Sequence, residues 1–220
     1  YYIMKLSVET VNVLKNFSMI NPSVMVEGGN EIVTMAPSKT IVAKAKTDEQ
    51  FRQPFAIYEL SKFLGIISML EEPEYDWGKD SVEITAKNGN VTYAYADPSM
   101  IIAPIAKSIP MENIITTFQL EQNHITNVIK AASILQTDLV RIYCEDGNLK
   151  VGTADYKNPG AHKFDQVIKE IDNVDFSVFV KTENIVKVLP DEYTVSVDQK
   201  QIIEFRNNRN TYWIVSENKQ

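Results

Sequence analysis

The segment PFAIYELSKFLGIISML, residues 54–70, contains the pattern that decides the fold class. From Leu60 onward its apolar residues recur at the spacing of an amphipathic helix. The apolar stripe consists of Leu60, Phe63, Leu64 and Ile67. Lys62 lies on the opposite side with the small residues Ser61, Gly65 and Ser68. The stripe therefore needs an apolar surface to pack on, whereas Lys62 faces water or an anionic partner.

Three further segments have a helical period, at residues 7–20, 121–135 and 181–190, and the last of them is ended by Pro190. Short β-branched and aromatic runs lie between them, with turn signals at Gly28-Gly29, Asn88-Gly89 and Asp146-Gly147. We read each of these three signals as a hairpin. This alternation predicts an α+β fold in which helices cover one face of strand-rich sheets.

The order of strands and helices in the first half of the chain recurs in the second half. VLKNFSMI from Val13 matches VIKAASIL from Val128, an offset of 115 residues. Between the halves, residues 97–110 contain three prolines and have no clear period. The sequence therefore predicts two similar domains, residues 4–96 and 113–220, joined by a connector at residues 97–112.

Composition limits the classes of function. The 220 residues carry a net charge of −7, so binding to nucleic acid would need a local basic surface on an acidic body. The single cysteine, Cys144, cannot form an intramolecular disulfide, and its strand-like context favours a buried small hydrophobe over a nucleophile. No apolar run reaches the ~18–20 residues of a membrane-spanning helix, so we expect no membrane partner.

Motifs for chemistry are missing from the sequence. It has no phosphate-binding G-x-x-x-x-G-K-[ST] loop and no G-x-S-x-G elbow, and His124 and His162 lack metal-ligand spacing. We therefore expect no cofactor, no metal and no catalytic residues. One alternative remains, a hydrolase that uses the acidic run at residues 71–80, although such a run after a helix is more often a solvated loop.

Lysines and asparagines occupy the polar sides of the four helical segments. They are Lys15, Lys62, Lys130, Lys181 and Lys187, with Asn12, Asn16, Asn123 and Asn127. Each segment also has a glutamate near its start, so the lysines could simply complement the helix macrodipole. The functional interpretation is one positive surface that faces phosphate groups, to which the asparagine amides also donate.

Three strings in the chain resemble the sliding clamps of T-even-type bacteriophages. They are MKLSVETVNVLKNFSMIN from Met4, FAIYELSKFLGIISML from Phe55 and YADPSMIIAP from Tyr95. The resemblance is strong through the first ~105 residues and continues more weakly, mainly in LEQNHITNVIKAASILQTD from Leu120.

This resemblance implies the DNA clamp fold in a closed homotrimeric ring, with two domains per chain and a duplicated βαβββ unit in each domain. The helices would line the hole and the sheets would form the outer wall. Such a ring encircles double-stranded DNA without reading its sequence, tethers the replicative DNA polymerase and is opened by an ATP-dependent clamp loader. It is not an enzyme, and it would act in the cytoplasm of the infected bacterial host.

The resemblance also implies an outer pocket for a short apolar peptide of a partner. The connector residues Met100, Ile101, Ile102 and Ile105 are its candidate wall, unless they pack on their own domain. Candidate edges for ring closure lie around Tyr93 and at residues 161–167. The alternative from another functional class is a monomeric interaction scaffold that has the same domains but does not encircle DNA.

Overall fold

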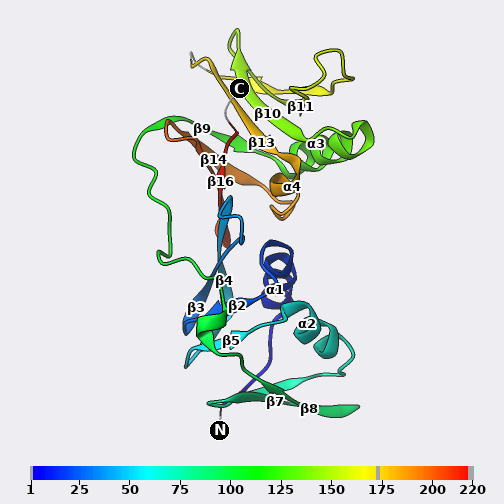
Figure 1. Cartoon of the computed structure of the whole chain (residues 1–220), viewed down its shortest axis with the longest axis vertical. Coiled ribbons are helices and arrows are strands. Elements are labelled where there is room, and N and C mark those ends of the chain that lie inside the picture. Colours follow the sequence, from blue (N-terminus) through cyan, green and yellow to red (C-terminus); the bar gives the residue numbers. More distant parts are fainter. Residues whose placement is uncertain (1, 172–173, 218–220) are drawn as a thin grey trace. The chain divides into compact units, whose positions relative to one another are not determined.

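The chain divides into two compact units, and each consists of two βαβββ repeats. The structure, a computed structural model, describes residues 2–171 and 174–217. The N-terminal unit comprises residues 1–108 and the C-terminal unit residues 109–220. In both units a strand precedes each helix and three strands follow it (Figure 1). This order confirms the predicted duplication.

The N-terminal unit exchanges one strand between its two repeats. The first repeat comprises β1 (Ile3–Met4), α1 (Val8–Ile20), β2 (Val24–Val26), β3 (Gly29–Met35) and β4 (Ile41–Phe51). The second comprises β5 (Phe55–Ile57), α2 (Leu60–Ser68), β6 (Glu74–Trp77), β7 (Ser81–Ala86) and β8 (Gly89–Ala94), and a short 3-10 helix, η1 (Pro98–Met100), follows it. Strand β1 joins β6, β7 and β8 in one sheet, whereas β5 pairs with β2 of the first repeat. The first β-strand of each repeat therefore pairs with a strand of the other repeat.

The C-terminal unit repeats this exchange. Its elements are β9 (Ile114–Leu120), α3 (Gln122–Leu135), β10 (Leu139–Glu145), β11 (Asn148–Ala154) and β12 (Asp165–Glu170), then β13 (Phe176–Lys181), α4 (Thr182–Ile185), β14 (Tyr193–Asp198), β15 (Ile202–Arg206) and β16 (Asn210–Val215). Strand β13 pairs with β10 of the first repeat. Strand β9 pairs with β14 of the second repeat. The two units therefore share the element order and the exchanged first strands, but β10 pairs with β11 whereas the corresponding β2 is a sheet neighbour of β5 alone.

Apolar helix faces and aromatic rings form the core of the N-terminal unit. Helix α1 packs on β3 and β4, and α2 lies beside α1 (Figure 1). The fully buried ring of Phe63 in α2 lies 6.3 Å from Trp77 of β6 and 5.2 Å from Tyr93 of β8. The apolar stripe predicted at residues 60–67 is thus the face that covers the β6–β8 sheet.

The turn signals have mixed outcomes. Asp146 and Gly147 have φ of 52° and 74° and close the β10–β11 hairpin as predicted. In the β7–β8 hairpin Ala86 pairs with Gly89, so the turn falls on the two residues between them. Gly28 and Gly29 have positive φ, yet β2 pairs in register with β5 and β3 with β4, so the hairpin predicted there is wrong.

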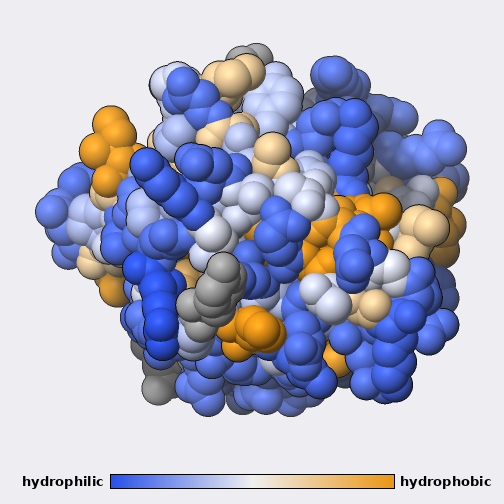
Figure 2. Space-filling view, turned by 90° about the horizontal axis from the view of Figure 1, so that it is seen from below, coloured by the Kyte–Doolittle hydropathy of each residue, from blue (hydrophilic) through white to orange (hydrophobic). Residues whose placement is uncertain are grey.

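One face of the molecule is mostly polar (Figure 2). Figure 2 shows a face on which hydrophilic side chains predominate and apolar ones emerge at scattered places. Within the described part of the chain, none of the helices has both the length and the apolar character needed to cross a membrane.

Candidate nucleic-acid interface

Helix α1 presents Asn12 and Lys15 to solvent. The helix begins after Ser7, whose hydroxyl accepts a hydrogen bond from the Thr10 amide at 3.0 Å and so caps the first turn. The buried face of α1 follows the helical period, and Asn12 and Lys15 lie outside it. The sequence pattern alone predicted this exposed position for both residues.

Asn16, which we expected on the same surface, is buried with only 3% of its area exposed. It lies three residues after Val13 and four before Ile20, so it shares their side of α1. Because α1 packs against α2 as well as against β3 and β4, its buried stripe is wide enough to include Asn16. The prediction that Asn16 faces a ligand is therefore wrong.

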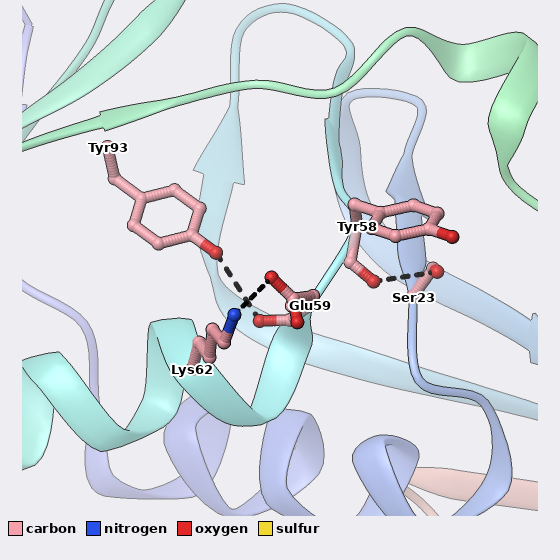
Figure 3. A network of polar contacts seen from close by, with 5 residues as sticks. All are labelled: Ser23, Tyr58, Glu59, Lys62 and Tyr93. Carbon is pink, nitrogen blue, oxygen red and sulfur yellow. Dashed lines mark hydrogen bonds and ion pairs between the residues drawn. The ribbon is translucent and has the colours of Figure 1, made fainter.

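Helix α2 holds Lys62 in a small polar network at its first turn (Figure 3). The Lys62 ammonium lies 2.7 Å from a carboxylate oxygen of Glu59. The Tyr93 hydroxyl, from strand β8, donates to the Glu59 carbonyl at 3.3 Å. The hydrogen bond with Glu59 and the charge of Glu59 raise the pKa of Lys62 above its ordinary value.

Helix α3 exposes Asn123, Asn127 and Lys130 on one side. Its buried residues are Ile125, Val128 and Ala132, which pack toward β10, β11 and β12. The helix ends at Gln136, whose φ of 53° takes the chain out of the helical conformation. The three polar residues therefore lie on the face turned away from the sheet.

Helix α4 is shorter than expected and does not carry its two lysines. Lys181 is the last residue of β13, and Lys187 follows the end of the helix at Ile185. Both side chains are half-buried. Lys181 also approaches Glu183 at 3.9 Å and Glu217 at 3.7 Å. The expectation that both lysines lie on the polar face of a helix over residues 181–190 is therefore wrong.

The connector residues that we considered as a peptide pocket are largely exposed. Met100, Ile102 and Ile105 have exposed fractions of 59%, 49% and 106%, while Ile101 is half-buried. The amide of Asn21 donates to the Ile102 carbonyl at 2.9 Å and so fixes the connector to the N-terminal unit. The side chains of Met100, Ile102 and Ile105 are thus exposed, while the connector backbone is held at Ile102 by a hydrogen bond.

Two acids of the run at residues 71–80, which a hydrolase would use, form ion pairs with lysines. Glu72 pairs with Lys87 at 2.5 Å, and Glu74 lies 3.7 Å from Lys5. Over residues 2–171 and 174–217, no three His, Cys, Asp or Glu residues are placed to hold a metal ion. Cys144 is buried, and this burial raises the pKa of its thiol.

Sequence reasoning did not find two hollows in the C-terminal unit. One, of 440 Å³, is lined by Tyr156, Lys181 and Glu217, and the other, of 460 Å³, by Arg141, Tyr156 and Lys163. The Arg141 guanidinium stacks 3.8 Å from the centre of the Tyr143 ring. These residues come from separate strands and loops, so no local sequence motif predicts the two hollows.

Comparisons with known proteins identify relatives of the chain. The family model described as DNA polymerase processivity factor matches residues 7–103. The sliding clamp of Vibrio phage KVP40 is 28% identical over 97% of this chain and 99% of that protein. The sliding clamp of Enterobacteria phage T4 is 30% identical over 67% of this chain and 65% of that protein.

Solved structures show the same fold at low identity. The proliferating cellular nuclear antigen (PCNA) of Entamoeba histolytica has a TM-score of 0.73 and 17% identity, with 98% of both chains covered. The PCNA of A. fulgidus, in a complex with the C-terminal region of FEN-1, has a TM-score of 0.74 and 11% identity over 99% of this chain and 98% of that one. With its four βαβββ repeats and its phage relatives, the chain belongs to the sliding clamps, the DNA polymerase processivity factors of T4-like bacteriophages.

Proposed function

We propose that three copies of the chain close into a ring that encircles double-stranded DNA without sequence specificity and tethers the replicative DNA polymerase. The observation that carries this proposal is the position of Lys15, Lys62 and Lys130. Each lies on the exposed side of a helix whose opposite side packs on a sheet. In this arrangement residues 4–96 and 113–220 are the two clamp domains and residues 97–112 connect them.

DNA contacts in such a ring go to phosphate groups. The exposed lysines supply the charge, and Asn12, Asn123 and Asn127 supply uncharged donors. Lys181 and Lys187 lie at the ends of a one-turn helix and contribute at the margin of this surface. Because phosphates repeat along the duplex regardless of sequence, contacts of this kind allow the ring to slide.

Ring closure uses open strand edges. Strand β8 is the last strand of the sheet β1-β6-β7-β8, and β12 is the last strand of the sheet β12-β11-β10-β13. Val167 on β12 is 61% exposed, although valine is usually buried in a sheet. We assign β8, with Tyr93, and β12, with the loop before it at residues 161–164, to the two sides of the contact between neighbouring copies.

The ring performs no chemical step. It raises the effective concentration of the polymerase, since a polymerase that releases DNA stays bound to the ring and rebinds nearby. An ATP-dependent clamp loader opens the ring at the start of synthesis, in the cytoplasm of the infected bacterial cell. The chain needs no cofactor for this function.

Partner proteins dock through a short peptide on the connector. Met100, Ile101, Ile102 and Ile105 provide the apolar wall, with Ile102 held by Asn21. Support comes from the A. fulgidus PCNA bound to the C-terminal region of FEN-1 and from a Helicobacter pylori β clamp bound to a DNA ligase peptide. A chain terminus of the polymerase is the expected occupant.

Two measurements test the proposal. Light scattering of the full chain at micromolar concentration should give a mass near 3 × 25.0 = 75 kDa. After loading, the protein should remain on nicked circular DNA and leave linear DNA through its ends. Equal retention on both substrates, or a stable monomer, would favour the interaction scaffold that does not encircle DNA.

A further inference from the structure

Glu59 lies at the start of α2, but its carboxylate does not cap the helix. It is the N-cap of α2, a position whose side chain commonly accepts a hydrogen bond from an amide of the first turn. Glu59 makes no such hydrogen bond. Its carboxylate instead binds the Lys62 ammonium at 2.7 Å, so helix capping does not account for it.

Hydrogen bonds from α2 and from β8 hold the backbone of Glu59, and so they position its side chain. The Glu59 carbonyl accepts from the amides of Lys62 at 3.1 Å and Phe63 at 3.2 Å. It also accepts from the Tyr93 hydroxyl at 3.3 Å (Figure 3). The Tyr93 ring packs edge-on against the buried Phe63 ring. Strand β8 thus holds the first turn of α2 in place, and the ion pair forms on a rigid base.

The other two exposed helix lysines differ from Lys62. Within residues 2–171 and 174–217, Lys15 and Lys130 take part in no ion pair, although all three lysines are exposed. A DNA phosphate can approach Lys15 or Lys130 directly. At Lys62 the Glu59 carboxylate already occupies one N–H donor of the ammonium, offsets its charge and repels an approaching phosphate.

We propose that Glu59 is a positioning residue that competes with DNA phosphate for Lys62 and so weakens one contact of the sliding surface. This inference rests on the proposed function, since it takes α2 to face DNA. Glu59 would act by lowering the affinity of the ring for DNA. A ring that neutralises fewer phosphates at once binds less tightly at each position and passes to the next one more easily.

The first experiment detects the competition without DNA. The full chain is treated briefly with an acetylating reagent, and the modification of each lysine is followed by mass spectrometry. Lys62 should react about two- to five-fold more slowly than Lys15 and Lys130, the range expected for an exposed ion pair. Glu59→Gln should remove this difference. Equal reactivity of the three lysines in the unmodified sequence would overturn the proposal.

The second experiment measures the consequence for DNA. Affinity for a fluorescent 30-base-pair duplex is titrated at several salt concentrations with the full chain. Glu59→Gln should strengthen binding by about two- to five-fold and steepen the salt dependence by up to about 0.9 in log–log slope for each released lysine that meets a phosphate. The double variant with Lys62→Gln should lose this gain.

A matched control separates the ion pair from net charge. Glu9 is an exposed acid in the first turn of α1 and forms no ion pair among the described residues, so Glu9→Gln removes the same charge without releasing a lysine. If Glu59→Gln and Glu9→Gln change binding equally, Glu59 has no special role. Joint replacement of Lys15 and Lys130 by glutamine tests the interface itself. If it weakens binding while the two glutamate variants remain alike, the inference fails and the proposed function stands.

Discussion

Asn21 offers a sharp test of how a buried side chain holds the connector. Its amide donates to the carbonyls of Met35 and Ile102, both at 2.9 Å, and its carbonyl oxygen accepts from the Ser23 amide at 2.8 Å. The side chain is 3% exposed. Asn21→Ala therefore removes the side-chain partner of three backbone groups.

The expected cost follows from these contacts. The Ile102 carbonyl belongs to an exposed segment and can be hydrated, so two unpaired groups remain, those of Met35 and Ser23. At about 1–3 kcal/mol for each unpaired buried group, Asn21→Ala should destabilise the N-terminal unit by about 2–6 kcal/mol. Even the lower bound corresponds to a loss of roughly 30-fold in protection of the Ser23 amide.

Hydrogen exchange measured by mass spectrometry gives the readout at the right place. Exchange should accelerate at Ser23 and across residues 101–107. Asn88→Ala is the matched control, because Asn88 also bridges two backbone groups, the Met69 carbonyl at 2.7 Å and the Glu71 amide at 2.8 Å, but is exposed. Its replacement should cost less than about 1 kcal/mol, since water takes over both hydrogen bonds. Equal costs for the two alanine variants would refute the reasoning from burial.

Three further predictions concern single side chains. Burial raises the pKa of Tyr75 to about 12 from 10.0, so its neutral form is favoured in the folded state. The contribution of this group to the free energy of unfolding is fully present below pH 10 and is lost as the pH rises to 12, a loss of up to about 2.7 kcal/mol. In urea denaturation, Tyr75→Phe should lose correspondingly less stability over this pH range. A Cβ at Gly152 would lie 2.5 Å from the Phe164 carbonyl, so Gly152→Ala should displace β12 and lower the trimer fraction in light scattering. A Cβ at Gly65 meets nothing within 4 Å, so Gly65→Ala in α2 should raise the free energy of unfolding by about 0.5–1 kcal/mol, and a decrease would show that this part of the helix surface is not open.

The sequence predicted what depends on local pattern. Helices α1 and α3 agree with prediction to within a residue at each end, because both have a clear apolar period and α1 also has a serine cap. The fourth helix was predicted too long, because Pro190 sets only an outer limit and the chain leaves the helix after Ile185. Asn16 was misplaced because periodicity gives the direction of a buried stripe but not its width.

Non-local arrangements could not be predicted in the same way. No residue of β1 indicates that it pairs with β6 and not with a strand of its own repeat. The Glu59–Lys62 pair was available from spacing alone, since residues three apart on a helix are neighbours. What the spacing could not reveal is that Tyr93 fixes the Glu59 backbone from another element.

The first β-strand of each repeat pairs with the other repeat of its unit, and this exchange has a consequence for synthesis on the ribosome. Ile3 pairs with Asp76 and Met4 with Tyr75. Strand β1 therefore cannot pair until β6 has been synthesised, about seventy residues later. A nascent chain that stops after β4 has an unmatched leading strand and also lacks β5, which completes β2. The two repeats are therefore interlocked, and a break between them should yield fragments that refold only when mixed.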